Sequence, residues 1–133
     1  MIKYMVDTNI CIYIMNQRPV KIIHAFKQCN IGEIGVSAIT VSELQYGAAK
    51  SKSRDINKQR IEEFLLPLEI LPYDDAASDI YGNIRFLLEK RGAVIGPLDL
   101  LIAAQAISRD LVLITNNTKE FNRVDDLKLE NWV

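Results

Sequence analysis

The segment Tyr4-Met5-Val6-Asp7-Thr8-Asn9 decides how this chain folds. The apolar run Tyr4–Val6 predicts a short buried strand, and residues 8–16 predict a helix that ends before the Arg18-Pro19 step. Asp7 stands between the two. A strand that passes directly into a helix is typical of α/β proteins, in which parallel strands alternate with helices.

Short apolar runs alternate with helix-length segments along the rest of the chain. Further strands are predicted at residues 34–37, 68–71 and 111–115, with an edge strand at 129–133. Helices are predicted at residues 20–28, 40–50, 61–65, 75–90 and 97–109. The sequence therefore predicts an α/β fold whose central, mostly parallel sheet has four to five strands flanked by helices, in a single domain spanning residues 1–133.

The composition is that of an ordinary globular protein. Of the 133 residues 49% are hydrophobic and 25% are charged, and the net charge of −1 argues against a generally basic nucleic-acid binder. Cys11 and Cys29 lack metal-ligand spacing, so we expect reduced thiols. No signal peptide and no membrane-length apolar stretch precede or interrupt the predicted elements, so we expect a cytoplasmic protein without a membrane partner.

Three acidic residues lie where an α/β sheet forms its active-site edge. Asp7 follows a strand, Glu43 lies within two turns of the next strand end, and Asp99 follows Pro97 in a first helical turn. Each has a structural alternative, as an N-cap, a solvated helical residue and a partner of the helix dipole respectively. If folding brings the three carboxylates together, a divalent cation would relieve their repulsion, which favours metal-dependent phosphoryl-transfer chemistry.

Polar residues also follow the last clear strand. Thr115, Asn116 and Asn117 add a hydroxyl and two amides, and Glu120 adds a fourth carboxylate. Asn117 and Glu120 have the spacing of a helix capping box, so a structural role and a functional role both remain open. The lone histidine, His24, is expected to be structural or exposed. A nuclease that cleaves with a pair of histidines is thereby excluded, and metal and carboxylates are left to do the chemistry.

A basic run follows the predicted helix that carries Glu43. It has a net charge of +4 and begins on the same helical face as Glu43, so we favour phosphate binding over a merely solvated surface. The run comprises Lys50, Lys52, Arg54, Lys58 and Arg60, with one acid, Asp55.

Four motifs together resemble those of the PIN-domain ribonucleases, and most closely the VapC toxins of type II toxin–antitoxin modules. They span almost the whole chain in the family's order. The motifs are M-V-D-T-N at 5–9, V-S-E-L-Q-Y-G-A at 41–48, G-P-L-D-L-L-I-A at 96–103 and L-I-T-N-N-T-K-E-F at 113–121.

This resemblance implies a PIN fold and a Mg²⁺ or Mn²⁺ site formed by Asp7, Glu43 and Asp99. Where the family often has a fourth acid, this chain has the T-N-N step. The candidates to replace that acid are the amides Asn116 and Asn117 or the carboxylate of Glu120, and the second metal position stays open. The resemblance further implies a homodimer, a cognate VapB antitoxin that alone contacts operator DNA, and a structured RNA substrate. A tRNA, in particular the anticodon stem-loop of the initiator tRNA, is the expected RNA.

The expected mechanism is hydrolysis that leaves a 5′-phosphate and a 3′-hydroxyl. A metal held by Asp7 and Asp99 would activate the attacking water, and Glu43 would bind the same ion or orient that water. Hydrogen-bonding side chains at the same edge are expected to position phosphate or water. They are Thr8, Asn9, Thr115, Asn116 and Asn117, with RNA contacts expected from Lys50, Lys52 and Arg54.

Three other classes of protein are alternatives to the ribonuclease. A phosphoacceptor receiver domain needs an acidic pair after its first strand, and an aspartyl-phosphate phosphatase needs a second Asp where this chain has Asn9. A non-catalytic PIN-fold module for RNA binding or dimerisation is the more serious alternative. Retention of the three principal acids argues against it.

Overall fold

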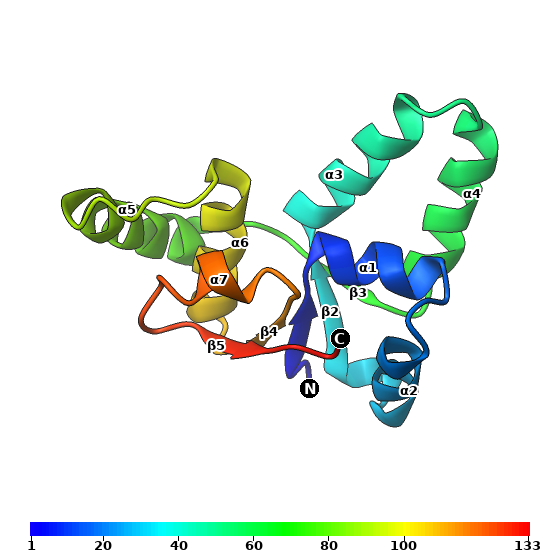
Figure 1. The fold of residues 1–133 in the computed structure, drawn as a ribbon, viewed down its shortest axis with the longest axis horizontal. Helices are drawn as coiled ribbons and strands as arrows, with labels where there is room; N and C mark the ends of the chain where they lie inside the picture. The colour runs from blue at the N-terminus through cyan, green and yellow to red at the C-terminus, as the bar shows by residue number, and fades with distance from the viewer.

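The computed structural model describes residues 1–133 and contains one sheet of five strands with helices packed on both of its faces (Figure 1). In chain order the elements are β1 (Tyr4–Val6), α1 (Thr8–Met15), α2 (Val20–Gln28), the 3-10 turn η1 (Ile31–Glu33), β2 (Ile34–Ser37), α3 (Ala38–Ala49), α4 (Arg54–Leu65), β3 (Glu69–Leu71), α5 (Asp75–Lys90), α6 (Pro97–Ser108), β4 (Val112–Ile114), α7 (Thr118–Phe121) and β5 (Lys128–Glu130).

The sheet has the strand order β3-β2-β1-β4-β5, and every neighbouring pair is parallel. The predicted α/β class and the predicted parallel sheet are therefore confirmed, with five strands and no antiparallel pair. The central strand β1 pairs with β2 on one side and β4 on the other. The chain thus reverses its direction of travel across the sheet at β1, and in such sheets the carboxyl ends around this point bind ligands.

Alternate residues of the central strands face two separate cores. Met5 packs in the core beneath α5 and α6, and Val6 packs in the core formed with α1 to α4. Leu113 and Ile114 of β4 divide between the cores in the same way. This two-sided burial follows from the alternation of side chains along a strand, and it explains why the strands are short uninterrupted apolar runs.

Most predicted element boundaries agree with the structure to within two residues. The helix predicted at 40–50 begins earlier, at Ala38, because the Ser37 hydroxyl accepts a hydrogen bond from the Ile39 amide at 3.0 Å and caps α3. The helix predicted at 61–65 begins at Arg54, so part of the basic run is helical.

His24 is exposed and hydrogen-bonds Gln28, and both cysteines are free thiols, with Cys11 buried and Cys29 only half-buried. None of the helices combines the length and the hydropathy needed for a membrane crossing.

Gly35 lies at a close approach between β2 and β3. A Cβ added there would lie 2.9 Å from Cδ1 and 3.1 Å from Cγ of Leu71, which is itself buried. We expect Gly35→Ala to lower the free energy of unfolding by about 1–3 kcal/mol through overpacking. Urea denaturation measures this change.

Gly82 provides the control for this prediction. It lies in the exposed part of α5, where an added Cβ meets no atom within 4 Å. Gly82→Ala should stabilise the protein by about 0.5–1 kcal/mol through helix propensity. Equal effects of the two substitutions would show that the β2–β3 contact is not tight.

Candidate active site at the carboxyl edge of the sheet

Asp7 lies at the centre of the carboxyl edge, directly after β1. It is 4% exposed, and the folded chain orients its carboxylate from two sides. The Thr8 amide donates to Oδ1 at 2.8 Å, and the hydroxyl of Thr115, just after β4, donates to Oδ2 at 2.8 Å. Asp7 is therefore the expected N-cap of α1, and it also presents a fixed carboxylate to the sheet edge.

Glu43 projects from the second turn of α3 toward the start of α1. The hydroxyl of Thr8 donates to Glu43 Oε1 at 2.8 Å, and it lies 3.2 Å from the hydroxyl of Thr40. Thr8 has only one hydroxyl proton, so the short bond to Glu43 leaves Thr40 as the donor to Thr8. Glu43 is thus held by a neighbour of Asp7 and does not extend freely into solvent.

Asp99 lies in the first turn of α6, partly buried, as its apolar neighbours in the sequence indicated. Burial is the largest cause of a rise in the pKa of Asp99 to about 7. The negative charges of Asp7, Glu120 and Glu43 raise this pKa further, in that order, and so does a hydrogen bond with the Glu120 carboxyl group. The structure therefore brings all four predicted acids into one electrostatic cluster, which we call the carboxylate cluster.

The pKa of Asp7 is also raised. Burial is again the main cause, hydrogen bonds from Thr115 and Thr8 lower the pKa, and the charge of Glu43 raises it. All four ion pairs of the chain lie elsewhere, so no Lys or Arg neutralises the cluster. A site of this kind stabilises positive charge.

The donor set of the carboxylate cluster fits a hard cation that keeps part of its water shell. No three His, Cys, Asp or Glu side chains lie close enough together to bind one ion directly, so a set of three direct protein ligands is not what the structure shows. Mg²⁺ is usually held by one or two carboxylates, and waters complete its coordination. Asp7 and Asp99, with Glu43 and Glu120 in the same cluster, supply carboxylates for such an arrangement.

Asn117 is the N-cap residue of α7, but the capping box that its spacing from Glu120 allowed does not form. The Asn117 side chain makes no cap bond; it donates to Glu120 Oε2 at 3.3 Å, and its backbone amide donates to the Thr115 hydroxyl at 3.0 Å. The Thr115 hydroxyl thus accepts from the Asn117 amide in place of the Glu120 carboxylate, and it donates to Asp7 at the same time. At the turn from β4 to α7, Thr115 and Asn117 therefore hydrogen-bond the carboxylates of Asp7 and Glu120.

Two predicted positioning residues lie outside this network. Asn116 is exposed, and its amide donates to the Tyr13 hydroxyl at 3.3 Å instead of to a carboxylate. Asn9 is exposed in the first turn of α1 and has no hydrogen bond from its side chain. Neither side chain is hydrogen-bonded to an acid of the cluster.

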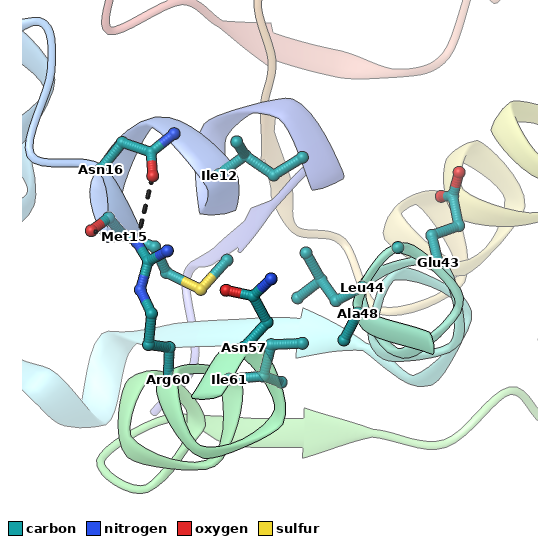
Figure 2. Close-up of a pocket in the computed structure, with 10 residues that line it drawn as sticks. Ile12, Met15, Asn16, Glu43, Leu44, Ala48, Asn57, Arg60 and Ile61 are labelled. Carbon is teal, nitrogen blue, oxygen red and sulfur yellow. Dashed lines mark hydrogen bonds between the residues drawn. The ribbon is translucent and has the colours of Figure 1, made fainter. Parts of the chain in front are cut away.

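Figure 2 shows a hollow beside the cluster, between α1, α3 and α4. It has a volume of about 230 Å³, and Glu43 stands at its rim with the carboxylate turned away from Arg60. Arg60 donates to Asn16 Oδ1 at 3.0 Å, so this part of the basic run closes the hollow.

A second groove, of about 730 Å³, runs from Thr8 and Glu43 to Lys50. Lys52 and Arg54 lie exposed beyond it, between α3 and α4.

The prediction from sequence missed three buried polar residues near this edge: Ser37, Thr40 and Gln105, each 0% exposed. Thr40 contacts the Thr8 hydroxyl, and Ser37 caps α3. Gln105 stands in the otherwise apolar run from Leu100 to Ala106, and a lone amide in such a run was the available signal.

A parallel sheet whose carboxyl edge carries a cluster of acids is an arrangement in which α/β proteins bind ligands, and such acids can hold a cation. Comparison with known proteins is more specific. The PIN domain family model matches residues 4–127. Ribonuclease VapC2 of Haemophilus influenzae is 49% identical over 133 residues and is covered completely, as is this chain. The tRNA(fMet)-specific endonuclease VapC of Shigella flexneri is 42% identical over 132 residues, or 99% of each chain.

A solved structure shares the same fold over its full length. The crystal structure of VapBC2 from Rickettsia felis bound to a DNA fragment from their promoter contains a chain that superimposes with a TM-score of 0.93. That chain is 42% identical, and each chain is covered completely. This protein belongs to the PIN-domain family and, within it, to the VapC ribonucleases.

The raised pKa of Asp99 predicts how pH affects stability when no metal is present. The folded protein holds this proton more tightly than the unfolded chain, whose ordinary value is 3.8, so stability should fall as the pH rises from that value toward about 7. Asp99→Asn removes the charge. In EDTA, urea unfolding should show the variant to be more stable than the wild type at pH 7.5, with no such gain at pH 4.5. An equal difference at both pH values would contradict the electrostatic origin.

Proposed function

We propose that this protein is a divalent-metal-dependent endoribonuclease toxin of a VapBC module, which hydrolyses structured RNA and thereby inhibits translation. The observation that carries the proposal is the carboxylate cluster, in which the charges of Asp7, Glu43 and Glu120 all raise the pKa of Asp99. Membership of the VapC ribonucleases supports RNA as the class of substrate.

Mg²⁺ or Mn²⁺ is the proposed cofactor, since all the available ligands are carboxylate oxygens. Asp7 and Asp99 would hold it, with Glu43 and Glu120 acting directly or through water. When bound, the ion supplies Lewis-acid activation of water and charge stabilisation at the phosphate. The chain's own acids set where that water and phosphate sit.

The threonine hydroxyls hold the acids in place. Thr115 donates to Asp7, and Thr8 donates to Glu43, so each hydroxyl fixes the rotamer of a carboxylate. Water and phosphate would therefore be positioned through Asp7 and Glu43 instead of by Thr8 and Thr115 themselves. Asn117 acts likewise on Glu120, which leaves Asn9 and Asn116, both exposed, as the residues proposed to contact RNA directly.

Lys50, Lys52 and Arg54 are proposed to bind RNA phosphates. They follow α3, whose groove begins at Glu43 and ends at Lys50, so a strand of RNA lying in the groove would reach both the acids and the positive charges. Phosphate contacts of this kind supply affinity with little sequence preference. We therefore expect the protein to distinguish one RNA from another mainly by the shape of the RNA.

A tRNA is the proposed substrate, and the initiator tRNA in particular, because relatives at 41–42% identity are named tRNA(fMet)-specific endonucleases. This activity belongs in the cytoplasm, where tRNA is used. By analogy with the VapBC structures, we propose a homodimer that is held inactive by a VapB-type antitoxin and that reaches promoter DNA only through that antitoxin.

The alternative is a PIN-fold module that binds RNA or dimerises without cleaving. Thermal unfolding with and without Mn²⁺ separates the two, because only the enzyme needs an ion at the carboxylate cluster. Stabilisation by Mn²⁺ that disappears in Asp7→Asn supports the enzyme.

Substitution of the acids tests the proposal. Asp7→Asn and Asp99→Asn should each reduce cleavage of a purified tRNA pool to background while leaving the protein folded, because each removes a metal-binding charge. Asp79→Asn, which removes the same charge from the exposed face of α5, is the matched control and should cleave like the wild type.

The products of the same reaction give a second readout. Sequencing should find new 5′-phosphate ends in Mg²⁺ or Mn²⁺ and none in EDTA. Full activity in EDTA, or products that end in a 2′,3′-cyclic phosphate, would contradict the proposed function.

A further inference from the structure

Gln105 is a fully buried polar side chain in a stretch of α6 that is otherwise apolar. It is 0% exposed, and its helical neighbours Ala103, Ala104 and Ala106 are buried as well. An amide placed in such surroundings loses its hydration, so it is stable there only if its donors and acceptor find partners in the protein.

All the hydrogen-bonding groups of the Gln105 amide find partners. Its Oε1 accepts from the Ser37 hydroxyl at 2.5 Å, and its Nε2 donates to the carbonyls of Leu71 at 2.8 Å and Pro72 at 3.0 Å. Ser37 and Leu71 are register partners at the carboxyl ends of β2 and β3. One side chain therefore ties α6 to the last paired residues of two strands.

These bonds connect α3 and α6, two of the helices that carry acids of the cluster. Ser37 is also the N-cap of α3, since its hydroxyl accepts from the Ile39 amide, and Glu43 follows six residues later on that helix. Asp99 lies six residues before Gln105 on α6. Figure 1 shows α3 and α6 standing on either side of the sheet edge, and the Gln105–Ser37 bond is a direct polar link between their supports.

We propose that Gln105 is a positioning residue that fixes the spacing of Asp99 and Glu43, and through it the affinity of the carboxylate cluster for a divalent cation. This inference rests on the proposed function. A buried amide that contributed only to the stability of the fold would not change the affinity for the cation.

The test is a measurement of Mn²⁺ affinity by the EPR signal of the free ion. Gln105→Met keeps the length of the side chain and removes every hydrogen bond. It should weaken Mn²⁺ binding about tenfold, the lower end of the effect of residues that orient metal ligands. Ile22→Ala is the comparator, because Ile22 lies on α2 and is buried in the core on the opposite side of the sheet from α6. Its truncation should destabilise the fold without contacting the cluster.

Ser37→Ala tests the same hydrogen bond from the strand side and keeps the test valid if Gln105→Met fails to fold. It should weaken Mn²⁺ binding in the same direction as Gln105→Met. If the two residues act through their shared bond, the double variant should bind Mn²⁺ no more weakly than the weaker-binding single variant.

The outcomes separate this inference from the proposed function. Wild-type Mn²⁺ affinity in folded Gln105→Met and Ser37→Ala, or the same loss in Ile22→Ala, would overturn the positioning role and leave the ribonuclease proposal intact. A wild-type protein that neither binds Mn²⁺ nor cleaves RNA would overturn the proposed function itself.

Discussion

Repulsion among four carboxylates is the constraint on which this site depends. Asp7, Glu43, Asp99 and Glu120 come from four separate parts of the chain, and folding brings them to one edge of the sheet without a neutralising Lys or Arg. Burial first, and then the neighbouring negative charges, disfavour the ionised form of Asp99 and raise its pKa. In the proposed function, a bound divalent cation would offset both effects, so the site is less stable without its ion.

The scaffold resists this repulsion with neutral hydrogen bonds. Hydroxyl groups of Thr8 and Thr115 donate to the carboxylates of Glu43 and Asp7, and both threonines are neighbours of the strand ends that define the edge. A hydroxyl orients a carboxylate without cancelling its charge, whereas a Lys or Arg would compete with the metal. The choice of threonine at these positions therefore preserves the negative potential of the cluster.

Much of the fold could be predicted because its signals are local. Each buried strand is a short apolar run, as at residues 34–37, and helices such as Asp75–Lys90 have apolar residues at helical spacing. The acids could be predicted as a group because parallel strands place their carboxyl ends at one edge. The start of α4 was missed because polar residues give helix signals weakly when one face is exposed.

The details of the site depend on contacts that the sequence does not encode locally. Asn117 and Glu120 have capping-box spacing, yet the Thr115 hydroxyl accepts the Asn117 amide in place of the Glu120 carboxylate. The same hydroxyl donates to Asp7, which is far away in the sequence. The partners of Gln105 lie more than 30 positions away in the chain, and no pattern in the sequence around it identifies them. Such long-range hydrogen bonds become visible only when the strand register is known.

The most direct test of this account is the location of a bound ion. In a crystal soaked with Mn²⁺, the anomalous difference map should show a peak at the carboxyl edge of the sheet, with carboxylate oxygens of Asp7 and Asp99 bonded to the ion or to its waters. A peak elsewhere on the chain, or no peak at saturating Mn²⁺, would contradict the claim that these acids form a metal site.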